Sequence, residues 1–248
     1  MSKVAFVRRL LSEYHYSPAV LPVLWNRIRT GTLPNTRQAN RALWGSYNWS
    51  AEGEEWSNKE IPGWKESIVE KLLLPFIAEG LVVLEIGPGA GRWTEHIVEH
   101  AAKLTLVDVT PECIAMCRQR FADKKNIEFH VNEGNDLSFV ESSTIDRVWS
   151  FDVFVHILAV DVEPYVSEIS RVLVPGGQAL IHHSKNGASS GPWRSDMTDG
   201  LMREFAQRNG LEVVDQFESW GDGIQRLWPE LPPEQNHDVI TLLRKPSE

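Results

Sequence analysis

Residues 83–92 read Val83-Leu84-Glu85-Ile86-Gly87-Pro88-Gly89-Ala90-Gly91-Arg92, an apolar run that ends in three alternate glycines. The pattern predicts a buried strand, a glycine turn and the start of a helix. Glycine lets the backbone approach a ligand closely, and the first N–H groups of the helix have no partner within it. A glycine turn can also be a purely structural junction, so its neighbours decide its meaning.

Two acidic residues accompany the turn. Glu85 lies two residues before Gly87, and Asp108 ends the next expected strand 21 residues after it. A carboxylate at position 85 repels a pyrophosphate but balances an amine, whereas Asp108 suits the two hydroxyls of a ribose. Arg92 stands where a dinucleotide site expects its third glycine, which disfavours an NAD-dependent oxidoreductase. The pattern indicates a ligand with an amine, a ribose and no phosphate.

The chain from residue 64 onward alternates between strand and helix patterns. We expect strands at 81–86, 103–108, 127–131, 146–151, 178–183, 211–217 and 238–243, and helices at 64–78, 92–101, 111–121, 163–173 and 199–209. Such alternation predicts an α/β fold with a doubly wound, mostly parallel sheet of seven strands. Ligands of such sheets bind beyond the carboxyl ends of the strands.

Residues 1–63 form a different kind of segment. Prolines and glycines interrupt them, which predicts a helical and irregular N-terminal extension rather than an independent domain. The chain has ten tryptophans, and four of them fall within 21 residues of this region: Trp44, Trp49, Trp56 and Trp64. Two interpretations remain open: an aromatic cluster that fixes the extension to the domain at 64–248, or a lid over the ligand.

Composition limits the partners. A formal charge of −9 over 248 residues disfavours a broad nucleic-acid surface. No apolar run reaches the roughly 18 residues of a membrane span, and no secretory leader is recognisable, so we expect a cytoplasmic protein with a small-molecule substrate. Cys113 and Cys117 are expected to be reduced thiols. The spacing of Cys and His residues does not match a zinc site. The spacing of Asp152, Asp196 and the nearby histidines does not require a magnesium site either, so we expect no metal. Nothing indicates the oligomeric state.

Over roughly residues 64–245 the sequence resembles the class I, Rossmann-like S-adenosylmethionine-dependent methyltransferases, and in particular their small-molecule branch. The resemblance rests on four ordered motifs: residues 84–91 with Asp108, residues 132–137, residues 145–150 with His156, and residues 171–177. It implies seven strands, the last of them antiparallel. It also implies S-adenosylmethionine as cofactor and S-adenosylhomocysteine as product.

The resemblance also implies a cofactor site. In this family the glycine turn packs against the methionine part, the acid after the second strand holds the ribose, and residues after the third strand flank adenine. Glu133 stands where many members carry Asp. The expected cofactor-binding residues are Glu85, Gly87, Gly89, Gly91, Asp108, Val109, Glu133, Gly134, Asn135 and Ser150.

Three histidines lie where the fourth and fifth strands end, and histidine titrates near neutral pH, as a general base must. His156 follows the fourth strand, and His182 and His183 end the fifth, where only one of the two can face the cleft. A structural role is the alternative for each. Trp193 and Arg194 in the loop after the fifth strand, with Asp152, are the expected substrate-binding residues.

These features predict a methyltransferase that acts on a small hydroxylated molecule, by O-methylation of a sugar or natural-product hydroxyl with a histidine base. An N- or C-methyltransferase of another metabolite is the alternative. A non-catalytic S-adenosylmethionine-binding module is a further one, because folds of this kind can lose their chemistry.

Overall fold

The computed structural model describes residues 12–14, 18–57, 61–187, 193–221, 225–229 and 231–247. A seven-stranded sheet runs through its centre in the order β3-β2-β1-β4-β5-β9-β6. Its strands are β1 (Val82–Ile86), β2 (Lys103–Asp108), β3 (Ile127–Val131), β4 (Ile145–Phe154), β5 (Leu173–Ser184), β6 (Glu212–Phe217) and β9 (Asp238–Arg244).

Strands β3, β2, β1, β4 and β5 pair in parallel, and β9 lies antiparallel between β5 and β6. The predicted α/β fold with seven strands and an antiparallel last strand is therefore confirmed. Since β9 runs the other way, its first residue lies beside the end of β5, where Ser184 pairs with Asp238.

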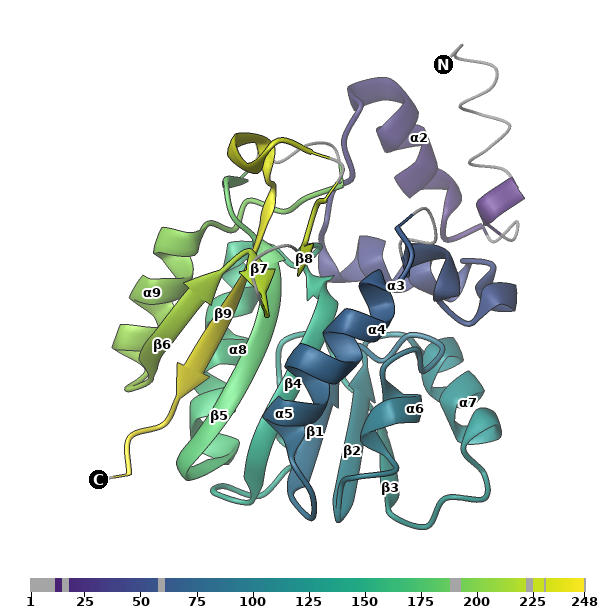
Figure 1. Cartoon of the computed structure of the whole chain (residues 1–248). Coiled ribbons are helices and arrows are strands. Elements are labelled where there is room, and N and C mark those ends of the chain that lie inside the picture. Colours follow the sequence, from purple (N-terminus) through teal and green to yellow (C-terminus); the bar gives the residue numbers. More distant parts are fainter. Residues whose placement is uncertain are drawn as a thin grey trace.

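Helices cover both faces of the sheet (Figure 1). The helices are α2 (Leu21–Thr30), α3 (Arg37–Gly45), α4 (Trp64–Ile68), α5 (Leu74–Ile77), α6 (Thr94–Ile97), α7 (Pro111–Arg120), α8 (Ala159–Val172) and α9 (Asp199–Arg208). Alternate residues of each strand serve the two faces. Leu84 and Ile86 join the core under α8 and α9, while Val83 joins the core under α4, α6 and α7.

Some elements differ from the sequence-based expectation. Strand β5 begins at Leu173 instead of 178, although its pairing with β4 is irregular before Gln178, where Gly176 has φ +79°. A short hairpin of β7 (Ser219–Trp220) and β8 (Gln225–Arg226) was not predicted. The helix expected over 64–78 contains a π-helical stretch, Val69–Leu73, just before Pro75, whose missing N–H prevents a normal helical bond there.

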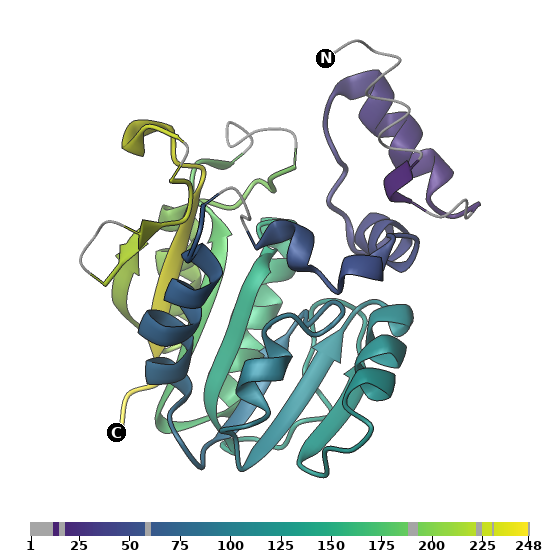
Figure 2. The same cartoon turned by 45° about the vertical axis from the view of Figure 1, so that its right-hand side comes forward.

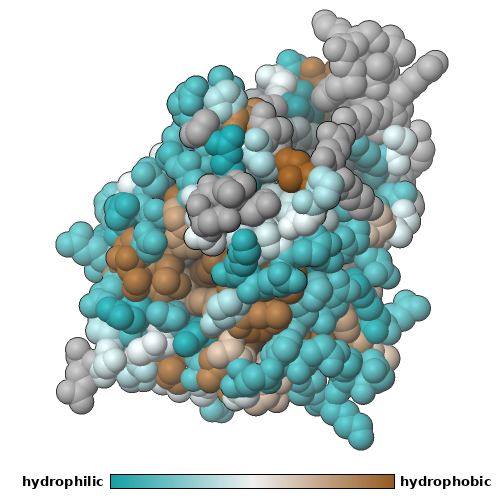
Figure 3. Space-filling model, in the orientation of Figure 1, coloured by the Kyte–Doolittle hydropathy of each residue, from teal (hydrophilic) through white to brown (hydrophobic). Residues whose placement is uncertain are grey.

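The N-terminal extension lies across the carboxyl ends of the strands (Figure 2). Helix α3 begins with Thr36, whose side chain accepts a hydrogen bond from the Ala39 N–H at 3.2 Å, and it packs between α2 and α7. Helix α2 stands farther out, and its buried residues Val23 and Leu24 join a separate small core with Leu43 of α3. Most of the face shown in Figure 3 is hydrophilic, with hydrophobic patches near its middle.

Trp149, at the centre of β4, packs on the face of the sheet that α6 covers. Its side chain is fully buried, and its ring lies 5.8 Å from that of Phe151 and 6.1 Å from that of Trp93. We expect Trp149→Ala to lower the free energy of unfolding by about 3–5 kcal/mol, because the cavity left behind cannot collapse fully. Urea unfolding measures this. The control Val160→Ala, at a side chain that is 72% exposed, should change it by less than about 0.5 kcal/mol.

Candidate functional site

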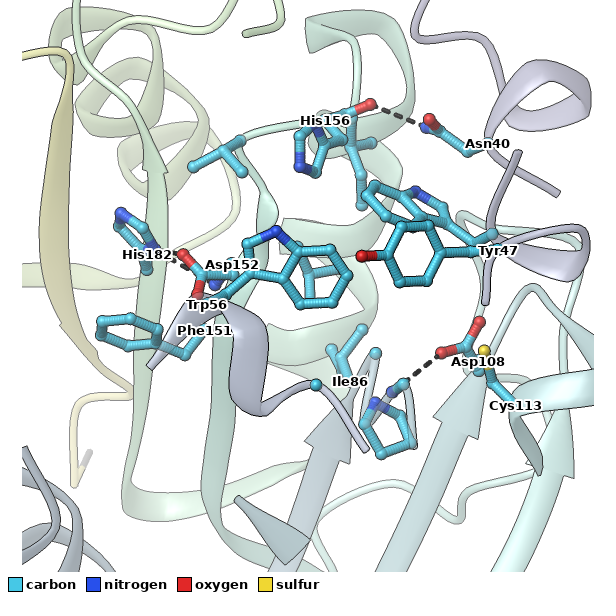
Figure 4. A pocket seen from close by; sticks show the side chains of 18 of the residues that line it. Asn40, Tyr47, Trp56, Ile86, Asp108, Cys113, Phe151, Asp152, His156 and His182 are labelled. Carbon is cyan, nitrogen blue, oxygen red and sulfur yellow. Dashed lines mark hydrogen bonds and ion pairs between the residues drawn. The ribbon is translucent and has the colours of Figure 1, made fainter. Parts of the chain in front are cut away.

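A cavity of about 720 Å³ opens at the carboxyl edge of the sheet, beneath the N-terminal extension. The glycine turn, the ends of β2, β4 and β5, the start of β9 and the extension line it. Figure 4 shows Asp108 and Cys113 on one side of the cavity, with Asp152, His182 and Phe151 on the opposite side. Its volume and its two polar ends suit a ligand of cofactor size with a second molecule beside it.

The glycine turn is held in a conformation that side chains would obstruct. Gly87 has φ +73°, and a Cβ there would lie 2.4 Å from the side chain of Val153 at the end of β4. Gly89 has φ +57°, and a Cβ there would lie 2.8 Å from the ring of Trp49 in the extension. Both glycines line the cavity, as expected, so their backbone forms part of its floor.

Asp108 presents its carboxylate beside this turn. Its Oδ1 accepts the Thr110 N–H at 2.8 Å, and its Oδ2 accepts the Gly89 N–H at 3.4 Å. Desolvation in the cavity wall raises the pKa of Asp108 to about 6, although these hydrogen bonds oppose the shift. The two N–H groups fix the carboxylate with an edge toward the cavity, an arrangement that suits a pair of ligand hydroxyls.

Two buried polar groups near the turn have atoms without partners among the described residues. Glu85 is 1% exposed, accepts a hydrogen bond from the Thr94 hydroxyl at 2.7 Å and leaves its other oxygen unpaired. Burial raises the pKa of Glu85 to about 8. Arg92, 6% exposed, donates to Asp152 at 2.5 Å but leaves its second terminal nitrogen unpaired. Of the two, Arg92 lines the cavity, so its unpaired nitrogen suits an anionic ligand group, whereas Glu85 lies behind the lining.

His156 is oriented by a hydrogen bond to the chain. Its Nδ1 lies 2.8 Å from the Trp193 carbonyl oxygen, which can only accept, so Nδ1 carries the proton of the neutral ring. The Nε2 lone pair therefore remains available, and the residue lines the cavity. Burial and the charge of Arg194 lower the pKa of His156 to about 4, so the ring is neutral at pH 7.

His182 lies between two carboxylates. Its Nδ1 is 3.1 Å from Asp152 and its Nε2 is 3.4 Å from Asp238. Burial lowers its pKa, but the two carboxylates outweigh this and raise the pKa above the ordinary value. Despite burial, His182 and Arg92 hold the pKa of Asp152 well below its usual range. The two carboxylates therefore favour the charged form of the imidazole, whereas the Asp152 backbone N–H, which donates to Nδ1 at 3.1 Å, favours an unprotonated nitrogen there.

Asp152 has left-handed backbone geometry, with φ +62°. The pairing of β4 with β5 is irregular between Ser150 and Phe154, which turns the Asp152 side chain toward the cavity. Non-glycine residues adopt such a φ at a cost of about 1–3 kcal/mol, and such strain concentrates at functional sites.

The structure places several expected site residues away from the cavity lining. His183 is fully buried, with Nδ1 bonded to the Ser184 carbonyl and Nε2 to the Thr241 hydroxyl, so neither nitrogen can act on a substrate. Ser150 is also fully buried and ties β4 to β1 through the Ile86 carbonyl. The others off the lining are Glu85, Gly91, Glu133 and Asn135, whereas Gly87, Gly89, Asp108, Val109, Gly134, Asp152, His156, His182, Trp193 and Arg194 line it.

Aromatic side chains of the extension cover the cavity. Trp44, Tyr47, Trp49 and Trp56 contact one another with ring centroids 4.8–6.1 Å apart. All four line the cavity, and Trp44 also lies 5.2 Å from the His156 ring. The two interpretations left open by the sequence are therefore compatible, because the same rings pack together and form the roof.

Polar side chains of the extension hold this roof on three loops of the domain. Asn35 donates to the Arg194 carbonyl at 2.9 Å, and Asn40 donates to the His156 carbonyl at 2.7 Å (Figure 4). Arg37 forms an ion pair with Asp161 at 3.0 Å and hydrogen-bonds to Asn135 at 3.3 Å. The roof is thus attached beyond β3, β4 and β5.

The sequence did not single out Asp238 or the roof contacts. Asp238 is fully buried and accepts two hydrogen bonds from Arg194, at 2.7 and 2.8 Å. The position of Asp238 could have been predicted from the sequence. An acid that begins an antiparallel strand must lie at the edge of the sheet where the neighbouring parallel strands end. Asn35 and Asn40 lack such a signal, since turn asparagines are common.

In the part of the chain that the structure describes, no group of three His, Cys, Asp or Glu side chains is arranged for a metal ion. Both cysteines are free and buried. None of the helices among the described residues is long and apolar enough to cross a membrane.

Comparisons with known proteins agree with this geometry. Residues 83–177 match the family model of a methyltransferase domain. Nodulation protein S of Rhizobium tropici is 27% identical over 164 residues, 65% of each chain. A fatty-acid O-methyltransferase of Mycolicibacterium smegmatis is 25% identical over 169 residues, 65% of this chain and 59% of that protein. The chain thus matches slightly less than two thirds of the length of these relatives.

Solved structures share the fold. The N-methyltransferase NodS of Bradyrhizobium japonicum, in complex with S-adenosylhomocysteine, superposes with a TM-score of 0.59 at 19% identity, covering 80% of this chain and 98% of that one. A putative methyltransferase bound to the Trm112 activator of Haloferax volcanii gives a TM-score of 0.57 at 19% identity, covering 80% and 96%.

The pKa values of the two cavity histidines should be shifted in opposite directions from the ordinary value. We expect the His156 ring to titrate near pH 4 and the His182 ring above 6.5, as measured by NMR with His156→Gln and His182→Gln for assignment. Between about pH 4 and 6.5 the folded chain then binds fewer protons at His156 than the unfolded chain, so this contribution to stability falls as the pH drops through that window. A His156 signal that titrates at 6.5 or above would contradict the burial and the effect of the Arg194 charge to which the low pKa is assigned.

Proposed function

Since this chain belongs to the class I, Rossmann-like S-adenosylmethionine-dependent methyltransferase family, we propose that it is an enzyme that methylates a hydroxyl oxygen of a small molecule such as a sugar or natural product. The observation that carries the proposal is one cavity with a ribose-binding arrangement at Asp108 and a neutral imidazole at His156. Desolvation and positioning of the reactants provide much of the acceleration in such a reaction.

The residues present suit S-adenosylmethionine. Asp108 would accept hydrogen bonds from the ribose hydroxyls, and the backbone of Gly87 and Gly89 would lie against the methionine part. The unpaired nitrogen of Arg92, which lines the cavity, offers a cation for the carboxylate of the methionine part. Glu85 lies behind the lining and is not proposed to contact the ammonium directly. When bound, the cofactor supplies an electrophilic methyl group.

His156 is the proposed base. The Trp193 carbonyl holds its Nδ1–H, so Nε2 can accept the proton of an acceptor hydroxyl. His182 is not proposed as a base, because the carboxylates that flank it favour its charged form. It serves instead to hold Asp152 and Asp238, and Asp152 with Arg194 and Trp193 would bind the acceptor.

The extension at 12–57 is the proposed lid. Its aromatic roof excludes water from the cavity, and its contacts to the loops beyond β4 and β5 fix the carbonyls of His156 and Arg194. A reaction that needs a desolvated nucleophile benefits from such a cover.

An amine acceptor is the second candidate. The observation that favours it is the low pKa of His156, about 4, which makes the ring a weak base for a hydroxyl. A neutral amine attacks through its own lone pair and loses its proton afterwards, so it needs no strong base.

Asp108→Asn should weaken S-adenosylmethionine binding by about 10- to 150-fold, the loss of about 1.5–3 kcal/mol typical of charge-assisted hydrogen bonds. Calorimetric titration measures the dissociation constant. Asp215→Asn, at an exposed acid on β6, is the matched control and should bind like wild type. An unchanged constant for Asp108→Asn would remove this residue from the cofactor site.

His156→Gln should lower kcat at least about a hundredfold and leave the dissociation constant of the cofactor nearly unchanged, because a base acts on the acceptor proton. His130→Gln, on β3 outside the cavity lining, is the control. The wild-type rate should fall on the acid side with an apparent pKa below 6.5, nearer 4, since protonation removes the Nε2 lone pair. If His156→Gln keeps most of kcat, the amine acceptor becomes the better explanation.

A further inference from the structure

Helix α2 carries an apolar stripe that faces solvent. Leu21, Trp25 and Ile28 are 50%, 66% and 43% exposed. Their spacing of four and three residues places them along one side of the helix. The buried residues Val23 and Leu24 belong to the core shared with α3, and Leu24, three residues after Leu21, marks the edge where the stripe meets that core. The stripe is therefore additional to what the extension needs for its own packing.

The position of α2 makes this stripe accessible. Both cartoon views show the helix beyond the carboxyl edge of the sheet, apart from the strands (Figures 1 and 2). Another side of the same helix reaches the cavity through Arg27. The outer surface that holds the stripe and the cavity wall are thus two sides of one helix.

Charge is distributed unevenly between this region and the rest of the chain. The N-terminal extension, residues 1–63, contains eight Lys and Arg and five Glu, which gives a formal charge of +3. The remaining residues carry 17 Lys and Arg against 29 Asp and Glu, a formal charge of −12. Arg29 adds an exposed guanidinium on α2 itself. A negatively charged surface would attract the extension and repel the rest of the domain.

We propose that the stripe of Leu21, Trp25 and Ile28 docks the protein on an anionic lipid surface. The three side chains would enter the apolar boundary below the headgroups, where tryptophan is favoured, and Arg29 would meet the lipid phosphates. A second copy of the chain fits less well, because two extensions of formal charge +3 repel each other. The proposal goes beyond methyl transfer and requires neither cofactor nor acceptor.

Vesicle co-sedimentation tests the docking on the full chain. Vesicles of phosphatidylcholine mixed with phosphatidylglycerol should bind the protein at least about tenfold more tightly than phosphatidylcholine alone, and high salt should weaken this binding. Leu21→Ser/Trp25→Ser should weaken it at least about tenfold, and Arg29→Gln about fivefold. Val214→Ser, at a side chain on β6 that is 44% exposed, is the control and should bind like wild type.

Circular dichroism and thermal unfolding establish that each variant is folded. The proposal is overturned if folded wild type does not sediment with the mixed vesicles, or if the double variant binds them as wild type does. Light scattering tests whether a second copy of the chain binds the stripe instead. If wild type is a dimer that Leu21→Ser/Trp25→Ser dissociates, and wild type does not bind vesicles, the stripe would be a dimer interface.

Discussion

The close approach of Gly87 to Val153 is the constraint on which the site depends. A Cβ at Gly87 would lie 2.4 Å from that side chain, so the ends of β1 and β4 can stay together where no side chain intervenes. Parallel pairing of β1 with both β2 and β4 then brings Asp108 and Asp152 to the same edge. Because each strand must leave the sheet at this edge, its polar terminal residues meet there without disturbing the apolar layers.

The charged groups at the Asp152 end depend on one another. Ion-pair contacts link Arg92, Asp152, His182, Asp238 and Arg194 in that order from one side of the cavity to the other. A buried charge without a partner costs several kcal/mol, so removal of any member exposes its neighbours to that cost. This explains why a histidine at a strand end can be unsuitable as a base, since its neighbours favour the proton that a base must lack.

Whether a feature of this molecule can be predicted from the sequence depends on how far apart along the chain its interacting residues lie. The glycine turn and Asp108 follow from local pattern and from spacing along successive strands, so they could be predicted with the fold. The pairing of Asp238 with Arg194 joins residues 44 apart, and Asn35 contacts the Arg194 carbonyl across 159 residues. His182 and His183 look alike in the sequence, and the side of β5 that each one faces separates them. Ser150 was expected at the cofactor but bonds to the Ile86 carbonyl, because a buried hydroxyl must find a partner.

The roof and the proposed base are physically linked. The Trp193 carbonyl that fixes the tautomer of His156 belongs to the loop whose next residue, Arg194, is held by Asn35, while Asn40 bonds to the carbonyl of His156 itself. Burial under the roof also lowers the pKa of His156, which keeps the ring neutral but weakens it as a base. A ligand that displaced the aromatic rings would rehydrate the ring and raise its pKa toward the ordinary value. The cover that keeps water from a desolvated nucleophile therefore also limits the strength of the base beneath it, so transfer to a hydroxyl would depend on the positioning of the acceptor as well as on His156.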